Sequence, residues 1–513
     1  ALMQYDAIVI GAGNGGLVAA ARLSQLGFKV LLAEQNDAPG GCASSFKRGR
    51  FEFETALHEL CDLGSTANPG TFLWDIFNDL GVAERIDWRA VPDAFRAIST
   101  APGELGYDVR MPFGREAFAD AMEEACPGSR KSMRTFYELM DDTAAALDYS
   151  NKMLGRPDDA VMKKEHGRFL RFAPYSTTRV LDAIGMPRRA QSILSTYWSY
   201  LGTPCDRLAF LHYAIMVRMY LDPGAYIPAA RSHEISLALT DRIRELGGEV
   251  WFGAPVEKVH VKNGAVCGAR VDGEDISCKV VISNAMPHAV YGNLIDNADV
   301  PSWERKKANA RRLAMSGFVV YLGMDAAAEE LGIEDYSVFI SHTGDSAADF
   351  KKLSSIEKND LSIFNCLNIV VPECSPKGTS IVYGTSLYQP EAWNGVSAHN
   401  YAHVKEEVAA RFIADYEKTT GISLAGHIEE IETAAPPTFA RYLGTPQGTI
   451  YGYLTADWDN MLSRLRTMYE NKGIRGLRFT GGHAEWSSGF NAAYSMGDIA
   501  ANTMVPYLHG QEA

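Results

Sequence analysis

The sequence predicts an α/β fold with a mixed α+β part inserted into it, and three observations support this prediction. Residues 7–33 alternate between short apolar strands and a helical pattern, which is typical of a parallel sheet. Apolar strand patterns return much later, at 250–261, 280–285 and 476–480. Residues 70–225, which separate the first strands from the later ones, have mainly helical periodicity.

A glycine-rich turn follows the first predicted strand. The apolar run Ala7–Ile10 leads directly into Gly11, Gly13 and Gly16, which are spaced as G-x-G-x-x-G. Gly11 permits a tight turn, Gly13 lets a pyrophosphate approach the backbone, and Gly16 lets the next helix pack closely on the strand. The N-terminus of that helix offers free N–H groups and a positive dipole end to phosphates. The segment therefore predicts a Rossmann-type dinucleotide-binding unit.

The same unit supplies further expected cofactor contacts. Asn14 and Gly15 lie inside the glycine turn, and Val30–Ala33 forms the second strand. Glu34 closes this strand, where a carboxylate can accept hydrogen bonds from the hydroxyls of a ribose. We expect the neighbouring Gln35 to contact the cofactor as well.

Composition excludes several classes of protein. A chain of 513 residues predicts about two to three structural units. A net charge of −14 argues against a nucleic-acid partner or a polybasic membrane anchor. No apolar run approaches the roughly 20 residues that span a bilayer, and the first strand begins too early for a signal peptide. The eight dispersed cysteines suit reduced thiols. We expect a cytoplasmic protein that is at most peripheral to a membrane.

A second glycine turn carries a family resemblance. Gly40, Gly41 and Cys42 form this turn, Ser45 follows it, and His58 comes after an alternating F-x-F strand. The pattern E-x5-G-G-x-x-x-S/T-F-x-x-G-x-F-x-F-E/D-x-x-x-H resembles the second cofactor segment of the FAD-dependent amine-oxidase-like superfamily. Within it, the pattern resembles the branch of phytoene desaturases, carotenoid isomerases and retinol saturases. The resemblance implies that Gly40, Gly41, Cys42 and Ser45 contact FAD.

Two positions depart from the pattern of these relatives. Many have an arginine directly after the glycine pair, above the cofactor phosphates, where this chain has Cys42. The phosphate charge must then be met elsewhere, and Lys47, Arg48 and Arg50 are candidates. Relatives also usually have two glycines shortly after a Y-x-P element, where this chain has Ala230-Arg231. We expect this change to reshape the substrate pocket.

The resemblance extends to the middle and the end of the chain. It implies that Val256 pairs its backbone with the adenine and that Asn284, at the end of a strand, contacts the cofactor. Residues 438–452 also resemble the desaturase and isomerase branch. Residues 476–493 resemble the C-terminal flavin segment, where a helix N-terminus stabilises negative charge on the reduced flavin. The cofactor contacts implied there are Gly482, His483, Phe490 and Asn491.

The predicted domains are discontinuous. Residues 1–100, 223–300 and 446–513 are expected to form the FAD-binding domain. Residues 101–222 and 301–445 are expected to form the substrate-binding domain. No second G-x-G-x-x-G follows a strand, so a tightly held NADPH is not expected.

The expected function is that of an FAD-dependent oxidoreductase acting on C=C bonds. The resemblance implies saturation, desaturation or isomerisation of a hydrophobic polyene, isoprenoid or lipid by hydride transfer at flavin N5. An external electron donor or acceptor is expected, and the sequence leaves the oligomeric state open. The catalytic candidates are His58, His483 and Glu485, with Glu59 and Tyr494 as more distant ones. A hydrogen-bonded structural role is the alternative for His58.

Other interpretations stay open. A flavin amine oxidase that produces hydrogen peroxide shares the same frame and would need an aromatic cage, for which Trp486, Tyr494 and Tyr451 are available. A non-catalytic flavoprotein is a third alternative. A covalent flavin link through a histidine or cysteine is not required by any spacing. His399 and His403 have i, i+4 spacing but no third ligand in the pattern, so no metal is expected.

One strongly apolar segment has two interpretations. Leu208 to Leu221 contains only scattered polar residues. It could line an entrance for an apolar substrate or touch a membrane surface, but an apolar helix is more often part of a core.

Overall fold

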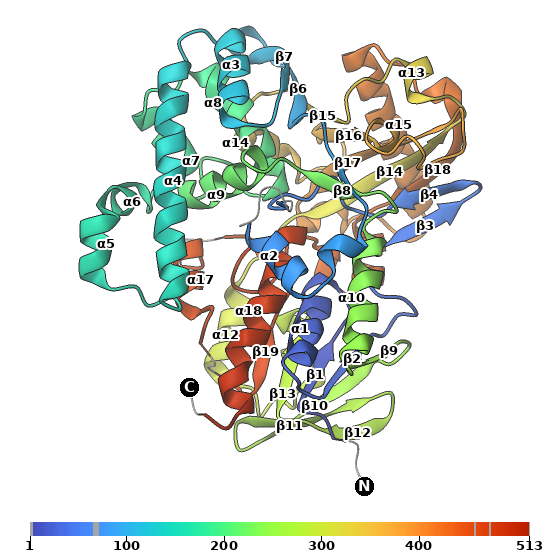
Figure 1. Ribbon diagram of the computed structural model, residues 1–513. Helices are drawn as coiled ribbons and strands as arrows, with labels where there is room; N and C mark the ends of the chain where they lie inside the picture. Colours follow the sequence, from blue (N-terminus) through green and yellow to red (C-terminus); the bar gives the residue numbers. More distant parts are fainter. Residues whose placement is uncertain (1–3, 65–70, 456–457, 471–472, 512–513) are drawn as a thin grey trace.

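The computed structural model describes residues 4–64, 71–455, 458–470 and 473–511. It consists of a lower part built on a parallel sheet, an upper part built on a large mixed sheet, and a helical region at one side (Figure 1). None of the described helices is long and apolar enough to cross a membrane.

The lower part is organised around a five-stranded parallel sheet. Its strands come from the start, the middle and the end of the chain, which confirms the predicted Rossmann-type fold. Their order across the sheet is β19 (Leu477–Phe479), β13 (Val280–Ser283), β1 (Ala7–Ile10), β2 (Val30–Ala33) and β9 (Glu249–Trp251). The three central strands are buried throughout and apolar, as expected of a parallel sheet that is covered on both faces.

Different layers cover the two faces of this sheet. Side chains alternate along β1, so that Ala7 and Val9 pack under helices, whereas Ile8 and Ile10 pack under a second sheet. The helices are α1 (Asn14–Gln25), α10 (His233–Glu245) and α18 (Phe490–Leu508). The second sheet is antiparallel and consists of β10 (Val256–Lys262), β11 (Ala265–Val271) and β12 (Glu274–Ser277).

The upper part contains a seven-stranded sheet. Only the pair β15 and β6 is parallel, and the other neighbours are antiparallel. The order is β18 (Ile428–Ala434), β14 (Ser316–Met324), β17 (Ser380–Tyr388), β16 (Ser362–Cys366), β15 (Ser337–Ser341), β6 (Phe95–Thr100) and β7 (Gly106–Met111). Helices α13 (Ala328–Leu331), α14 (Ser346–Lys352) and α15 (Tyr401–Thr420) accompany it.

The two faces of the seven-stranded sheet have different partners. Phe318 and Val320 of β14 belong to the core that includes Phe412 of α15. Val319 and Tyr321, on the opposite face, belong to the main core shared with the parallel-sheet part. This second face therefore closes over the glycine turns of the lower part.

A helical region completes the upper part. Its helices are α3 (Arg115–Ala125), α4 (Arg130–Lys152), α5 (Asp159–Glu165), α6 (Gly167–Phe172), α7 (Thr177–Ala183), α8 (Arg188–Leu194) and α9 (Phe210–Leu221). Most of α9 is buried, so the apolar segment from Leu208 to Leu221 is a core helix. The helix packs against α4 and α7.

Short elements join these parts. The ribbons are β3 (Ser45–Arg48) with β4 (Phe51–Glu54) and β5 (Trp88–Ala90) with β8 (Tyr226–Pro228). The remaining helices are α2 (Phe72–Asp79), α11 (Pro287–Ala289), α12 (Ser302–Ala310), α16 (Pro436–Leu443) and α17 (Met461–Thr467).

The domain limits stay a prediction. The predicted FAD-binding domain includes strand β6, which belongs to the upper sheet. Residues 1–100 were assigned to the FAD-binding domain, but β6 pairs with β15 in the upper sheet. The two strands lie far apart in the sequence, so a local pattern could not reveal this pairing.

We expect Gly16→Ala to lower the free energy of unfolding by about 3 kcal/mol, because an added Cβ forces α1 away from β1. That Cβ would lie 2.0 Å from the carbonyl oxygen of Gly11. Urea unfolding followed by tryptophan fluorescence measures the change. Gly167→Ala is the control, since a Cβ there meets no atom within 4 Å, and equal midpoints for the two variants would contradict the argument.

Candidate functional site

The first glycine turn is shaped by close backbone approaches. Gly11 has φ +88°, a left-handed conformation that favours glycine. Gly13 precedes α1 without a side-chain cap, so the first N–H groups of the helix are left for a ligand. The second glycine turn lies against the first, because the N–H of Gly40 donates to the carbonyl of Ala12 at 2.7 Å.

Asn284 lies between two glycine turns. A Cβ on Gly13 would come within 2.3 Å of Asn284 Nδ2, and a Cβ on Gly481 within 2.7 Å of Asn284 Oδ1. Asn284 Oδ1 is buried and has no hydrogen-bond partner among the described residues. The strand end at Asn284 is thus packed against the backbone that a dinucleotide would follow.

Glu34 is held in place by the backbone. Its Oε2 accepts a hydrogen bond from the N–H of Ala12 at 2.7 Å, and its Oε1 accepts one from the N–H of Asn36 at 2.9 Å. Each carboxylate oxygen has a second lone pair, so both can still accept a hydrogen bond from a ribose hydroxyl. The ribose contact stays a prediction.

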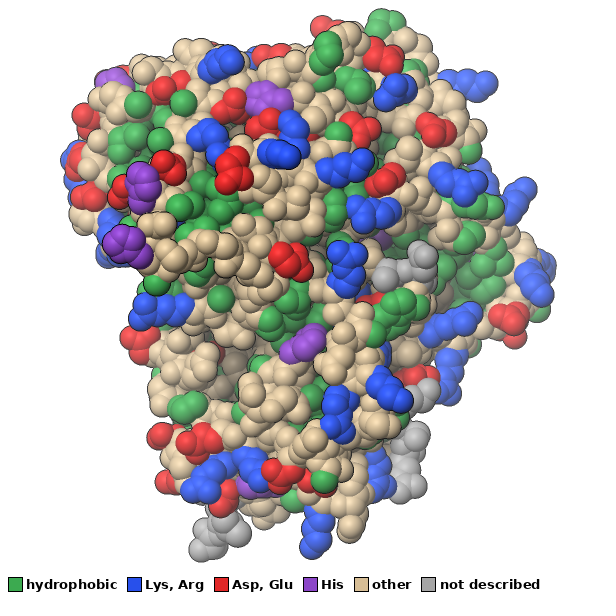
Figure 2. Space-filling model, turned by 180° about the vertical axis from the view of Figure 1, so that it is seen from behind, with side chains coloured by type: hydrophobic (Ala, Val, Ile, Leu, Met, Phe, Trp, Pro, Cys, Tyr) green, Lys and Arg blue, Asp and Glu red, His purple; other side chains and the backbone are tan. Residues whose placement is uncertain are grey.

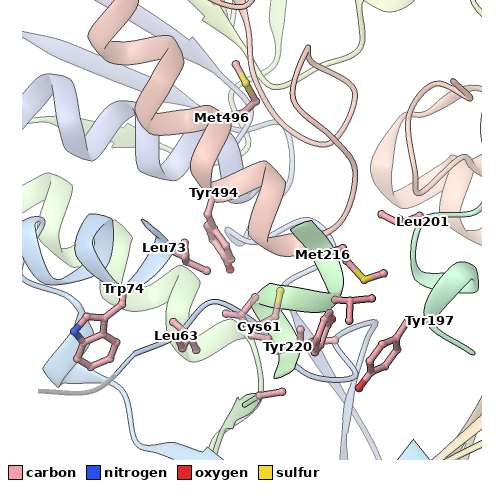
Figure 3. Close-up of a cluster of buried hydrophobic side chains, with 14 of the residues drawn as sticks. Cys61, Leu63, Leu73, Trp74, Tyr197, Leu201, Met216, Tyr220, Tyr494 and Met496 are labelled. Atoms are coloured by element: carbon pink, nitrogen blue, oxygen red, sulfur yellow. The ribbon is translucent and has the colours of Figure 1, made fainter. Parts of the chain in front are cut away.

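A large cavity extends from the glycine turns into the upper part. It encloses about 280 Å³ and is walled mainly by apolar atoms. Its apolar wall includes Ile215, Met216, Met219 and Tyr220 of α9 and Val319, Ile363 and Leu387 of the upper sheet. Figure 3 shows part of this wall, where Cys61, Met216 and Tyr220 lie among buried side chains. An extended hydrophobic molecule fits such a lining.

Most of the predicted cofactor residues meet at this cavity. Those that line it are Gly13, Asn14, Gly40, Gly41, Cys42, Asn284, Gly482, His483, Phe490 and Asn491. Four others have different surroundings: Ser45 donates a hydrogen bond to Glu52, Gln35 is exposed, Val256 pairs with Val271, and Glu34 lies behind the turn. The roles of these residues stay predictions.

Buried polar atoms around the cavity fit a bound cofactor. Asn14 Oδ1 and His483 Nε2 line it without a hydrogen-bond partner among the described residues, as does Asn284 Oδ1. A buried polar group without a partner is unfavourable, so these atoms suit the polar groups of a nucleotide cofactor. The N-terminus of α18, at Phe490, points at the same space.

His58 lies on the opposite side of the cavity, against the upper sheet. Its Nε2 is 2.9 Å from Thr385 Oγ1, and its ring contacts the rings of Tyr200 and Tyr383. Burial lowers the pKa of His58 to about 4, so the imidazole is neutral near neutral pH.

Glu59 lines the same cavity. Its side chain is protonated near neutral pH, whereas that of His58 is not. Its Oε1 accepts a hydrogen bond from the hydroxyl of Tyr200 at 3.0 Å, while its Oε2 is buried without a partner among the described residues. Burial raises the pKa of Glu59 to about 8, although the Tyr200 hydrogen bond opposes the rise. The carboxyl therefore carries a proton near neutral pH and can donate it.

His483 lines the same large cavity as His58, but Glu485 does not. His483 lines the large cavity and also a second, more polar cavity. Glu485 lines only the second cavity, where its Oε2 is 3.9 Å from Arg478 Nη2. Burial lowers the pKa of His483 to about 4. The acid–base roles of His483 and Glu485 stay predictions, and their positions favour Glu59 as the partner of His58.

The basic residues after the second glycine turn are engaged elsewhere. Arg48 and Arg50 form ion pairs with Glu432 and Glu429 of β18, at 2.9 and 2.6 Å. Neither lines the cavity. Phosphate charge would instead meet the N-terminus of α1. Burial raises the pKa of the Cys42 thiol to about 12, which keeps the thiol neutral.

Arg231 occupies the position where relatives have glycine. It has φ +76°, a conformation that suits glycine. Its guanidinium donates to the carbonyl oxygens of Glu52, Ala229 and Cys374. The arginine thus ties the ribbon of β3 and β4 to the upper part, and its effect on the shape of the substrate pocket stays a prediction.

Sequence reasoning left Thr385 unnamed and left open whether Tyr200 and His212 belong to a core or to a cavity. Tyr200, Thr385 and His212 line the large cavity, and His212 Nε2 lies 2.7 Å from Ser487 Oγ. Their own sequence surroundings carry no motif, so only the long-range contacts of the fold identify them. Among the described residues, no group of three or more His, Cys, Asp or Glu side chains is placed to hold a metal ion.

The fold and the cavity define a Rossmann-type flavoprotein. The family model of flavin containing amine oxidoreductases matches residues 15–505. The chain therefore belongs to the flavin containing amine oxidoreductase family, which confirms the predicted FAD cofactor and oxidoreductase class.

Relatives with assigned names lie in the predicted branch. An all-trans-retinol 13,14-reductase of Danio rerio is 24% identical over 478 residues, which cover 88% of this chain and 77% of the relative. Prolycopene isomerase 2, chloroplastic, of an Oncidium hybrid cultivar is 26% identical over 475 residues, with coverages of 88% and 75%. The solved structure of putrescine oxidase bound to putrescine has a TM-score of 0.62 at 14% identity, covering 98% of this chain and 99% of that one. This last likeness concerns the fold alone.

We expect Glu34→Ala to raise the dissociation constant for FAD about tenfold, because two ribose hydrogen bonds are lost. The backbone anchors of the carboxylate at Ala12 and Asn36 are lost with it. Titration of the apoprotein with FAD, followed by flavin fluorescence, measures the affinity. Asp37→Ala removes an exposed carboxylate three positions later and serves as the control. Equal affinities of the two variants would contradict the ribose assignment.

Proposed function

We propose that this protein is an FAD-dependent oxidoreductase that saturates, desaturates or isomerises a C=C bond in an extended hydrophobic substrate. The observation that carries the proposal is the apolar cavity between α9 and the upper sheet, which is continuous with the glycine turns. The names of the relatives, a retinol reductase and a prolycopene isomerase, support a polyene or isoprenoid substrate. We further propose that the protein works in the cytoplasm with an external electron donor or acceptor.

The chain's own residues would hold the cofactor at the base of this cavity. Gly13 and the first turn of α1 would bind the pyrophosphate, and Glu34 would bind the ribose. The N-terminus of α18 would face the pyrimidine end of the flavin, where its dipole favours negative charge. Bound FAD supplies hydride transfer at N5, and the apolar wall excludes water from the reacting carbon atoms.

Proton movement would fall to His58 and Glu59. A saturation needs a proton delivered to carbon, and protonated Glu59 can supply it from the carboxyl that Tyr200 orients. A desaturation needs a proton removed, and the neutral imidazole of His58 can accept it while Thr385 holds the ring. The pair therefore serves either direction of the reaction.

Amine oxidation is the second candidate. Of the three aromatic residues suggested for an amine cage, Tyr451 and Trp486 line the large cavity. Tyr494 is buried in the main core.

The oxygen reactivity of the flavin separates the two candidates. The holoprotein is reduced anaerobically, air is admitted, and recovery of the oxidised flavin absorbance is followed. We expect slow reoxidation, since C=C chemistry passes electrons to or from the substrate or a separate partner. Fast reoxidation with stoichiometric peroxide would overturn the proposal and make amines the first substrates to test.

A pH profile tests the role of Glu59. The pKa of Glu59 is raised to about 8, so the proton-donating form is present below this pH and is lost as the pH rises through it. We expect the rate of substrate saturation to fall across this range, and Glu59→Gln to be slowed about 100-fold, with the alkaline fall removed.

Tyr200→Phe provides the matched control for this profile. The Tyr200 hydrogen bond lowers the pKa of Glu59, so its removal should move the alkaline fall to higher pH. Infrared difference spectra between neutral and alkaline pH should show the protonated carboxyl in the parent protein but not in Glu59→Gln. An unchanged profile in both variants would exclude Glu59 as the proton donor.

A further inference from the structure

Exposed large apolar side chains gather at one corner of the helical region. Met153, Leu154, Leu170 and Tyr175 are 43%, 63%, 41% and 43% exposed. They lie at the end of α4, on α6 and just before α7. We call residues 152–179 the α4–α7 corner. An exposed apolar group of this kind marks an interaction site more often than isolated apolar residues do.

The α4–α7 corner is basic although the chain is acidic. It contains seven Lys and Arg residues against three Asp and Glu residues, in a chain whose net charge is −14. Three of the seven, Lys152, Arg156 and Arg168, are paired with acidic residues outside this range. Figure 2, which views the molecule from behind, shows hydrophobic side chains beside Lys and Arg at the right edge, the side on which α5 and α6 lie. Apolar and positive groups therefore share one exposed corner.

Several of these positive charges are available to a partner. Lys163, Lys164 and Arg171 are exposed, and none of them forms an ion pair with the described residues. By contrast, Arg168 is paired with Glu138 and Asp142 of α4. Lys163 and Lys164 of α5 and Arg171 of α6 are thus the cations available here.

The corner is also held rigidly in its exposed form. Phe169 and Phe172 of α6 are buried in the main core, and the ring of His166 stacks on Tyr149 of α4 at 5.6 Å. Leu154 has φ +50°, which is an unfavourable conformation for a branched side chain. The turn after α4 therefore presents Leu154 to solvent although its backbone conformation is costly.

We propose that the α4–α7 corner docks the protein onto an anionic lipid surface. Lys163, Lys164 and Arg171 would meet the headgroups, while the exposed apolar side chains enter the interface between headgroups and acyl chains. The corner is connected to the large cavity, because α4 and α7 pack on α9, whose side chains line it. The docking surface goes beyond the proposed reaction and does not depend on it.

The test measures binding of the full-length holoprotein to lipid vesicles by co-sedimentation. Vesicles of phosphatidylcholine with phosphatidylglycerol are compared with vesicles of phosphatidylcholine alone. We expect binding to the anionic vesicles only, weakened by added salt. Neutralising one lysine should weaken it about fivefold, so the double variant K163Q/K164Q should bind about 25-fold more weakly. The flavin spectrum reports that each variant is folded.

Two further variants separate the possible outcomes. K262Q/K279Q removes two exposed lysines of the lower part, one at the end of β10 and one just before β13, and should bind like the parent protein. Leu154→Ser removes one exposed apolar group and should weaken binding without changing its dependence on salt. Equal binding of the parent protein and K163Q/K164Q would overturn the proposal. Failure of the parent protein to bind anionic vesicles would also overturn the proposal, even if the corner bound an acidic protein instead.

Discussion

The close contact between β1, α1 and the later glycine turns is the constraint on which the rest of the structure depends. Gly16 approaches the carbonyl of Gly11, and a Cβ on Gly15 would lie 2.5 Å from Thr480 Oγ1. Residues from the start and the end of the chain can therefore meet here because Gly15 has no side chain. This contact brings the N-termini of α1 and α18 to one cavity, and with them two positive dipole ends. The parallel sheet reflects the same contact, because its neighbouring strands come from the start, the middle and the end of the chain.

Burial then gives the cavity its chemistry. Removing water disfavours the charged form of any group, which lowers the pKa of His58 and raises that of Glu59. Two adjacent residues thus become a neutral base and a neutral acid without any ion nearby. Such a pair does not attract a charged substrate. It suits a hydrocarbon, whose reacting carbon needs a proton but offers no charge to bind.

The sequence predicted those parts of the site that depend on local pattern. The strand, glycine turn and helix at 7–25 have a fixed spacing, so the cofactor end of the cavity could be located residue by residue. Glu485 could not be placed, because the turn after β19 sends it to the second cavity while His483 reaches both. Thr385 could not be found, and Tyr200 could not be assigned to the cavity, since both reach His58 and Glu59 only through tertiary contacts. The pairing of β6 with β15 was missed for the same reason.

Charge distribution decides how this protein can approach a surface. A chain with a net charge of −14 is repelled by an anionic membrane at long range, so only a local region of opposite charge can bring it into contact. The unpaired Lys163, Lys164 and Arg171 of the α4–α7 corner supply such a region, and attraction there orients the molecule. Docked in this way, α4 and α7 lie between the lipid and α9. An apolar substrate that partitions into the membrane would then be concentrated beside the helices that pack on the cavity wall.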